Sequence, residues 1–142
     1  MKNSEKMLSA IEAQDLVQAE QWFEKALLED SDSILLDLGE YLESIGFFLQ
    51  AKRIYNKLAL LYPQVNLNLA TIASEDGDLE EAFGYLEEIS SNDPWYVNAL
   101  LIKADLYQME GLPDVAREKL VEASQLSDDP IITFGLAEID FE

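Results

Sequence analysis

Carboxylates are the side chains in this sequence that could carry out acid–base chemistry. Asp and Glu number 29, and the pairs Glu80–Glu81 and Glu87–Glu88 could supply the two acids that such catalysis requires. Catalysis needs both acids in one pocket, whereas these pairs lie opposite the apolar stripe of their own segment. We therefore expect the pairs to face solvent, and the sequence supports a carboxylate enzyme only weakly.

The acidic run at residues 75–81 invites comparison with a calcium-binding loop. An EF-hand loop beginning at Asp76 would need Gly at its sixth position, and this sequence has Glu81 there. A turn followed by a capped helix is the better interpretation. We expect no metal site in this run.

Several residue types that catalysis commonly uses are absent from the chain. It contains no Cys and no His, which excludes a thiolate nucleophile, a Ser-His-Asp triad, an imidazole base and metal sites built on those ligands. Neither GxxxxGK[ST] nor GxGxxG occurs, so no Gly-rich phosphate loop is present. The sequence predicts a protein that is not an enzyme and that has no cofactor.

The net charge of −20 narrows the choice of partner. So acidic a surface repels nucleic-acid phosphates and anionic lipids, and we expect neither nucleic acid nor membrane as a partner. Apolar runs such as residues 58–62 are too short to span a bilayer. Residues 1–6 lack the apolar stretch of a secretory leader, which favours a cytoplasmic location.

An internal repeat organises the 142 residues. Gly46, Gly77 and Gly111 are spaced by 31 and 34 residues, and each is followed five residues later by Ala. A large apolar residue follows four positions beyond each Ala, at Tyr55, Leu86 and Leu120. Repeats with a period of this length are typical of stacked helical units.

Local patterns around each Gly predict a helix, a turn and a second helix. Residues 34–45 and 79–89 place apolar side chains at i, i+3, i+4 and i+7. Gly46 and Gly77 suit the left-handed position that ends a helix. The close approaches between paired helices are expected at small residues, namely Gly39 with Ala51, Ala70 with Ala82, and Ala104 with Ala116.

Helix starts are also indicated. Asp78 can cap the helix that follows it, with Glu81 completing a capping box. Pro113 is expected in the first turn of a helix. The pairs Asp93-Pro94 and Asp129-Pro130 each combine a capping acid with a first-turn proline, and each is expected to open a new helix pair.

This pattern resembles the tetratricopeptide repeat (TPR), a helix-turn-helix unit of about 34 residues. Lys103 departs from the family pattern, which has Leu there. The resemblance implies an all-α fold, an α-α superhelix or solenoid of stacked units. We predict one array over 1–142, with units at 1–31 (degenerate), 32–63, 64–96 and 97–130 and a half unit at 131–142. The best unit carries the pattern at Leu35, Leu38, Gly39, Leu42, Gly46, Ala51, Tyr55, Leu58 and Pro63.

Resemblance to the TPR family also implies a binding surface, because first helices line a concave groove in this family. The resemblance implies that the leucines at groove positions would give apolar contacts and that Asn68 would hydrogen-bond a peptide backbone. The acids at groove positions would favour a positively charged partner. Co-chaperone members hold a C-terminal carboxylate with Lys and Arg, and those charges are absent here. The predicted partner-binding residues are Leu36, Asp37, Glu40, Glu43, Leu67, Asn68, Thr71, Leu101 and Asp105.

Two functions are therefore expected. The first is a non-catalytic scaffold that binds a protein or peptide of basic or mixed charge. The alternative is self-assembly through the segment from Ile131 to Phe141, which is apolar on more than one side. That segment would either lead into a longer array, of which this chain is the N-terminal piece, or pack on a second copy. The self-association residues would be Phe134, Leu136, Ile139 and Phe141.

A small group of basic residues interrupts the acidic surface. No acid lies between Glu43 and Glu75, and Lys52, Arg53 and Lys57 all fall in that interval. These side chains either face solvent or form a polarised surface that orients a partner.

Overall fold

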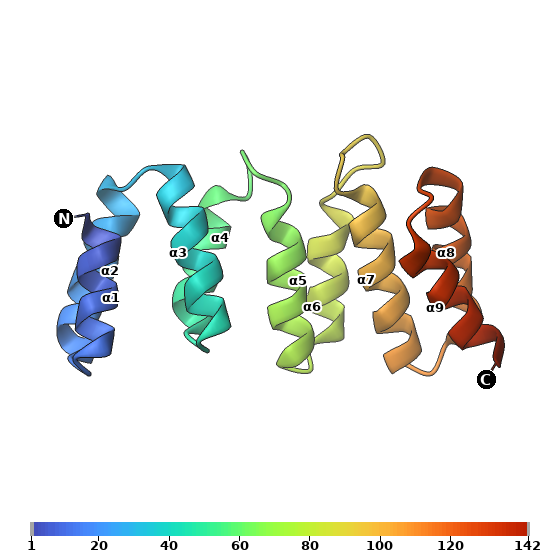
Figure 1. The fold of residues 1–142 in the computed structure, drawn as a ribbon, viewed down its shortest axis with the longest axis horizontal. Coiled ribbons are helices and arrows are strands. Elements are labelled where there is room, and N and C mark those ends of the chain that lie inside the picture. Colours follow the sequence, from blue (N-terminus) through green and yellow to red (C-terminus); the bar gives the residue numbers. More distant parts are fainter. Residues whose placement is uncertain (1, 142) are drawn as a thin grey trace. The chain divides into compact units, whose positions relative to one another are not determined.

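The computed structural model describes residues 2–141, and Figure 1 shows that the secondary structure of this region consists of helices. No strand occurs within residues 2–141, which confirms the predicted all-α class and the helical repeat architecture. The helices are α1 (Asn3–Glu12), α2 (Leu16–Glu29), α3 (Asp32–Ser44), α4 (Phe48–Leu58), α5 (Val65–Glu75), α6 (Leu79–Glu87), α7 (Tyr96–Met109), α8 (Pro113–Leu126) and α9 (Pro130–Phe141).

The chain divides into two compact units, Met1–Tyr62 and Pro63–Glu142. The first unit holds the helix pairs α1–α2 and α3–α4, and α1 also contacts α3. The second holds α5–α6 and α7–α8 with α9 packed on α8, and α5 also contacts α7. Within each unit, neighbouring helix pairs stack because one pair alone cannot bury its apolar faces.

Short polar side chains fix where several helices begin. The carboxylate of Asp78 accepts the backbone N–H of Glu81 at 3.0 Å, as predicted, and Asp15 and Ser31 cap α2 and α3 in the same way. Pro113 lies in the first turn of α8, and Asp129 accepts the N–H of Ile131 at 3.0 Å at the start of α9. Those predictions are confirmed.

Two details at the helix starts differ from the sequence-based predictions. Pro94 does not open a helix: α7 begins at Tyr96, and Asp93 accepts the N–H of Trp95 at 2.8 Å in the turn before it. The Glu81 carboxylate does not close a capping box. It accepts the hydroxyl of Tyr85 at 2.8 Å, one turn further along α6, and this bond holds it away from the N-terminus of the helix.

Three glycines end the first helices of the repeats. Gly46, Gly77 and Gly111 have φ values of 90°, 82° and 77°, in the left-handed region that side chains with a Cβ rarely adopt. The repeat spacing in the sequence is therefore the spacing of helix-ending turns.

The core of the first unit is built around a close approach of α3 and α4. A Cβ added at Gly39 would lie 3.0 Å from the ring of Tyr55 and 3.3 Å from Ile54. Gly39 therefore lies against Tyr55 and Ile54 of α4, and Ala51 of the same helix is also fully buried. Tyr55 is fully buried, and its hydroxyl donates to the carboxylate of Glu43 at 2.8 Å.

Small and branched side chains alternate through the core of the second unit. Ala70 and Ala82 are buried together between α5 and α6, and Ala104 and Ala116 between α7 and α8. Lys103 lies where the repeat pattern has Leu and is only 7% exposed. Its ammonium reaches past the core to Glu87 at 3.0 Å, so the alkyl part of Lys103 occupies the place of Leu.

Across residues 2–141, none of the helices combines the length and apolarity that crossing a bilayer would require.

Candidate functional site

All nine predicted partner-binding residues lie on the first helices of repeats. Leu36, Asp37, Glu40 and Glu43 lie on α3 in the first unit. The other five lie in the second unit, with Leu67, Asn68 and Thr71 on α5 and Leu101 and Asp105 on α7. The predicted residues are therefore divided between the two units.

In the first unit, a shallow hollow lies between α1 and α3. Asp37 is one of its lining residues, so the structure gives this predicted residue a concave setting. The hollow has mixed charge, because Lys2 and Glu5 also line it. Its remaining walls are formed by Ser4, Leu8, Ile34, Leu38 and Tyr41.

A second hollow, of about 300 Å³, lies between α7 and α9 in the second unit. The predicted residues Leu101 and Asp105 line it from α7, and Leu120 of α8 contributes to its wall. We call this the α7–α9 groove. It is lined by Leu101, Asp105, Gln108, Leu120, Ile131, Phe134, Gly135 and Glu138.

The side chains that line the α7–α9 groove change from apolar to acidic along the two helices. Leu101 and Asp105 are one turn apart on α7, and Phe134 and Glu138 are one turn apart on α9. Both helices run in the same direction (Figure 1). On each helix the apolar residue precedes the acid by one turn, so apolar side chains line one end of the groove and acids the other. A ligand that fits this groove must match an apolar half and an acidic half.

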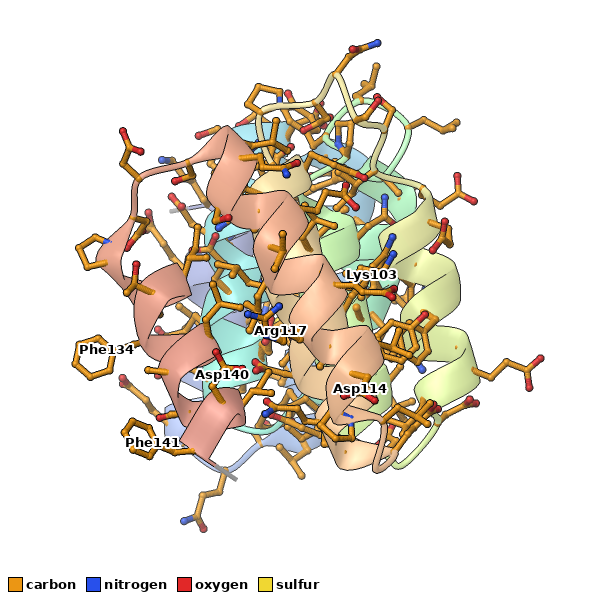
Figure 2. The ribbon with its side chains drawn as sticks, turned by 90° about the vertical axis from the view of Figure 1, so that its right-hand side faces the viewer. Lys103, Asp114, Arg117, Phe134, Asp140 and Phe141 are labelled. Atoms are coloured by element: carbon orange, nitrogen blue, oxygen red, sulfur yellow. The ribbon has the colours of Figure 1, made fainter. Side chains whose placement is uncertain are left out.

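The electrostatics of the acidic half support this arrangement. Partial burial, and then the neighbouring carboxylate of Glu138, raise the pKa of Asp105 above its ordinary value. The residues that line the groove include two acids and no base. Arg117 on the nearby helix α8 is engaged elsewhere, because its guanidinium contacts Asp140 of α9 at 2.9 Å (Figure 2).

The remaining predicted residues have roles inside their own units. Leu67 packs on the core between α5, α6 and α7, and the Thr71 hydroxyl donates to the carbonyl of Leu67 at 3.0 Å. Glu43 accepts the Tyr55 hydroxyl. Leu36 and Asn68 are half-buried, and Glu40 is exposed. The predicted residues Leu67, Asn68 and Thr71 on α5 are therefore only partly exposed.

Comparison with known proteins finds similarity over part of the chain. A family model described as YpiA-like, tetratricopeptide repeats matches residues 108–142, which include α8 and α9. The TPR repeat-containing protein YpiA of Bacillus subtilis (strain 168) is 46% identical over 63 residues, which is 44% of this chain. Both matches support the presence of tetratricopeptide repeats in this chain.

The similarity to TPR proteins indicates a general class of function. TPR units mediate protein–protein interaction, and TPR proteins are in general non-catalytic. The aligned region covers only 15% of the Bacillus protein. The specific partner of this TPR chain must therefore be argued from its own surface.

The wall that α9 contributes to the groove was not predicted from the sequence. Ile131, Phe134 and Glu138 come from α9, which was interpreted only as a site of continuation or self-association. Their i, i+3, i+7 spacing on one helix face was the signal that could have found them. A further requirement is Gly135, because a Cβ there would lie 3.2 Å from Leu120 and would hold α9 away from α8.

The four residues predicted to mediate self-association divide into two pairs. Phe134 and Phe141 are 71% and 93% exposed and project from the edge of α9 (Figure 2). Ile139 is buried against Ala104, Ala116 and Leu120, and Leu136 packs on the same cluster. Only the two phenylalanines therefore remain available to a second molecule.

The basic group on α4 joins two helices of its own unit. The Arg53 guanidinium pairs with Glu24 and lies 3.6 Å from Glu20, both on α2. Lys57 donates to the backbone carbonyl of Leu27. Arg53 lowers the pKa of Glu24 through hydrogen bonding and its positive charge. These contacts favour the view that the basic group stabilises the α2–α4 contact.

Among residues 2–141, no group of three or more Asp and Glu side chains has the arrangement needed to hold a metal ion.

Proposed function

We propose that this TPR chain is a non-catalytic scaffold that binds a segment of another protein along its first helices. The observation that carries the proposal is the α7–α9 groove, which combines apolar walls with two acids and contains no base. An apolar groove supplies affinity, and the unbalanced charge supplies selectivity for a positively charged partner.

The predicted residues have distinct roles in this proposal. Leu36, Leu67 and Leu101 would give apolar contacts at a recurring level of the repeats, and Asn68 would hold the backbone of the bound segment. Asp37, Glu40, Glu43 and Asp105 would favour Lys and Arg on that segment. A partner anchored by its C-terminal carboxylate fits poorly, because the α7–α9 groove would repel that charge.

Site-specific photo-crosslinking in cells that express this chain tests the proposal. The photoreactive residue p-benzoylphenylalanine replaces Tyr41 in the α1–α3 hollow, Gln108 in the α7–α9 groove, or Glu80 on the exposed side of α6. We expect the first two variants to become covalently linked to the same protein and the Glu80 variant to remain unlinked. The proposal fails if all three positions give identical products, or if only Glu80 reacts.

Self-assembly is a second candidate, because Phe134 and Phe141 leave an aromatic surface on α9 exposed. The net charge of −20 opposes the approach of a second copy. Light scattering over a wide concentration range separates the two functions. A mass that rises with concentration, and that falls to the monomer in a Phe134→Ser, Phe141→Ser variant, would favour self-assembly. A constant monomer mass would rule it out.

A further inference from the structure

The residues that line the α7–α9 groove indicate which kind of peptide segment could bind there. We infer that the groove binds a helical segment of a partner protein in which a large apolar residue is followed, one turn later, by Lys or Arg. This inference rests on the proposed scaffold function and specifies the partner of the same surface.

The order of side chains along the groove favours such a segment. Leu101, Ile131 and Phe134 form one end, and Asp105 and Glu138 lie one turn further along α7 and α9. One turn of helix advances about 5.4 Å, so a bound helix can place an apolar side chain and a basic side chain at the two levels together. The match requires the two residues to be three or four positions apart.

The negative charge of the groove favours a basic residue on the bound segment. The Asp105 and Glu138 carboxylates are close enough that Glu138 adds to the electrostatic cost of ionising Asp105. No base lines the groove. A Lys or Arg from the partner would relieve the repulsion between the two acids and gain an ion pair with each of them. A second copy of this acidic chain is a poor occupant for the same reason.

The shape of the apolar end of the groove suits a large apolar side chain. Phe134 is 71% exposed and stands at the edge of α9, away from α8 (Figure 2). Leu120 closes the base of the groove, and Gly135 lets α9 approach it. An apolar side chain entering from the partner would therefore contact Phe134 on one side and Leu101 on the other.

Nuclear magnetic resonance titration of the whole chain with defined peptides tests the inference. Each peptide has about 15 residues of an Ala/Gln helix, long enough for partial helicity in water. The first carries Leu with Arg four residues later, the second replaces Arg with Glu, and the third replaces Leu with Ala. We expect the Leu–Arg peptide to shift the amide signals of residues 101–108 and 131–138. We expect it to bind about tenfold more tightly than the Leu–Glu peptide.

Two variants with a matched control assign the effect to the groove. Asp105→Asn with Glu138→Gln should weaken binding of the Leu–Arg peptide about fivefold. Glu80→Gln with Glu88→Gln removes the same two charges from exposed positions on and beside α6 and should leave that binding unchanged. In Phe134→Ala, the preference for the Leu–Arg over the Ala–Arg peptide should largely disappear. Circular dichroism checks that each variant keeps its helices.

Several results would overturn the inference. They are equal binding of the Leu–Arg and Leu–Glu peptides, shifts confined to other helices, and no shift at millimolar peptide. Shifts of residues 131–138 with protein concentration alone would assign the groove to a second copy. If crosslinking from Tyr41 and Gln108 succeeds while the peptides give any of these results, the scaffold function stands and the proposed occupant is wrong.

Discussion

At the scale of single residues, the site depends on groups whose environment differs from that of their neighbours in the sequence. Asp105 and Glu24 are both surface acids, yet partial burial and Glu138 raise the pKa of Asp105 while Arg53 lowers that of Glu24. Composition alone could not distinguish them, because the difference comes from side chains on α9 and α4. The sequence shows that both residues are acids, but the directions of their pKa shifts depend on the folded structure.

The two acids should therefore give opposite pH dependences of stability. A raised pKa means that ionised Asp105 opposes folding, so its unfavourable contribution disappears as the pH falls from 7 through the folded pKa. The stabilising contribution of Glu24 is present above its unfolded pKa and is lost as the pH falls toward its lowered folded pKa. Between pH 7 and pH 4, urea unfolding should show Asp105→Asn gaining less stability than the wild type and Glu24→Gln gaining more. The reverse order would contradict these assignments.

Gly39 provides a second test at the residue scale. An added Cβ would lie 3.0 Å from the buried Tyr55 ring, so Gly39→Ala should destabilise the first unit by about 1–3 kcal/mol. Gly84 is also helical but has nothing within 4 Å of the added Cβ, so Gly84→Ala should stabilise the chain by about 0.5–1 kcal/mol. Urea midpoints of the two variants measure the difference. Equal effects of the two substitutions would argue against the Gly39–Tyr55 contact.

At the scale of elements, the helices of the repeats were predictable because their end signals are local. The glycines at 46, 77 and 111 and the cap at Asp78 act within a few residues, so their spacing indicated the turns correctly. Pro94 misled because its cap partner, Asp93, bonds the N–H of Trp95 in a turn before the helix. The spacing of Ile131, Phe134 and Glu138 showed that they share one face of a helix, but it did not show that this face lines a groove with α7, because that depends on how α9 packs on α8.

Pairing of α5 with α6 can be tested by overpacking. Ala82 is fully buried in one cluster with Ala70 and Ala73, so a longer side chain there would have to displace its neighbours. Ala82→Leu should lower the free energy of unfolding by about 1–3 kcal/mol. Glu80→Leu adds the same side chain at an exposed position of the same helix and should have a small effect. Unchanged thermal stability of Ala82→Leu would contradict the observed helix pairing.

At the scale of the whole molecule, stability and partner choice share one electrostatic cause. The 29 acids and 9 bases leave a charge of −20, and few acids in the described structure are offset by ion pairs such as Arg117–Asp140 and Arg53–Glu24. Repulsion among the remaining acids opposes folding, and the same excess attracts a basic partner. Composition alone predicted this balance, because net charge does not depend on how the helices are arranged.

Salt should therefore stabilise the free chain and weaken partner binding. The Debye length falls from about 30 Å at 0.01 M to about 8 Å at 0.15 M ionic strength, which screens repulsion between acids on different helices. The thermal midpoint should rise over this range of NaCl, while the affinity for the Leu–Arg peptide should fall. A chain with the control substitutions Glu80→Gln and Glu88→Gln should show a smaller rise, because two repelling charges are removed. A midpoint that falls with added salt would mean that ion pairs such as Arg53–Glu24 outweigh the repulsion among the unpaired acids.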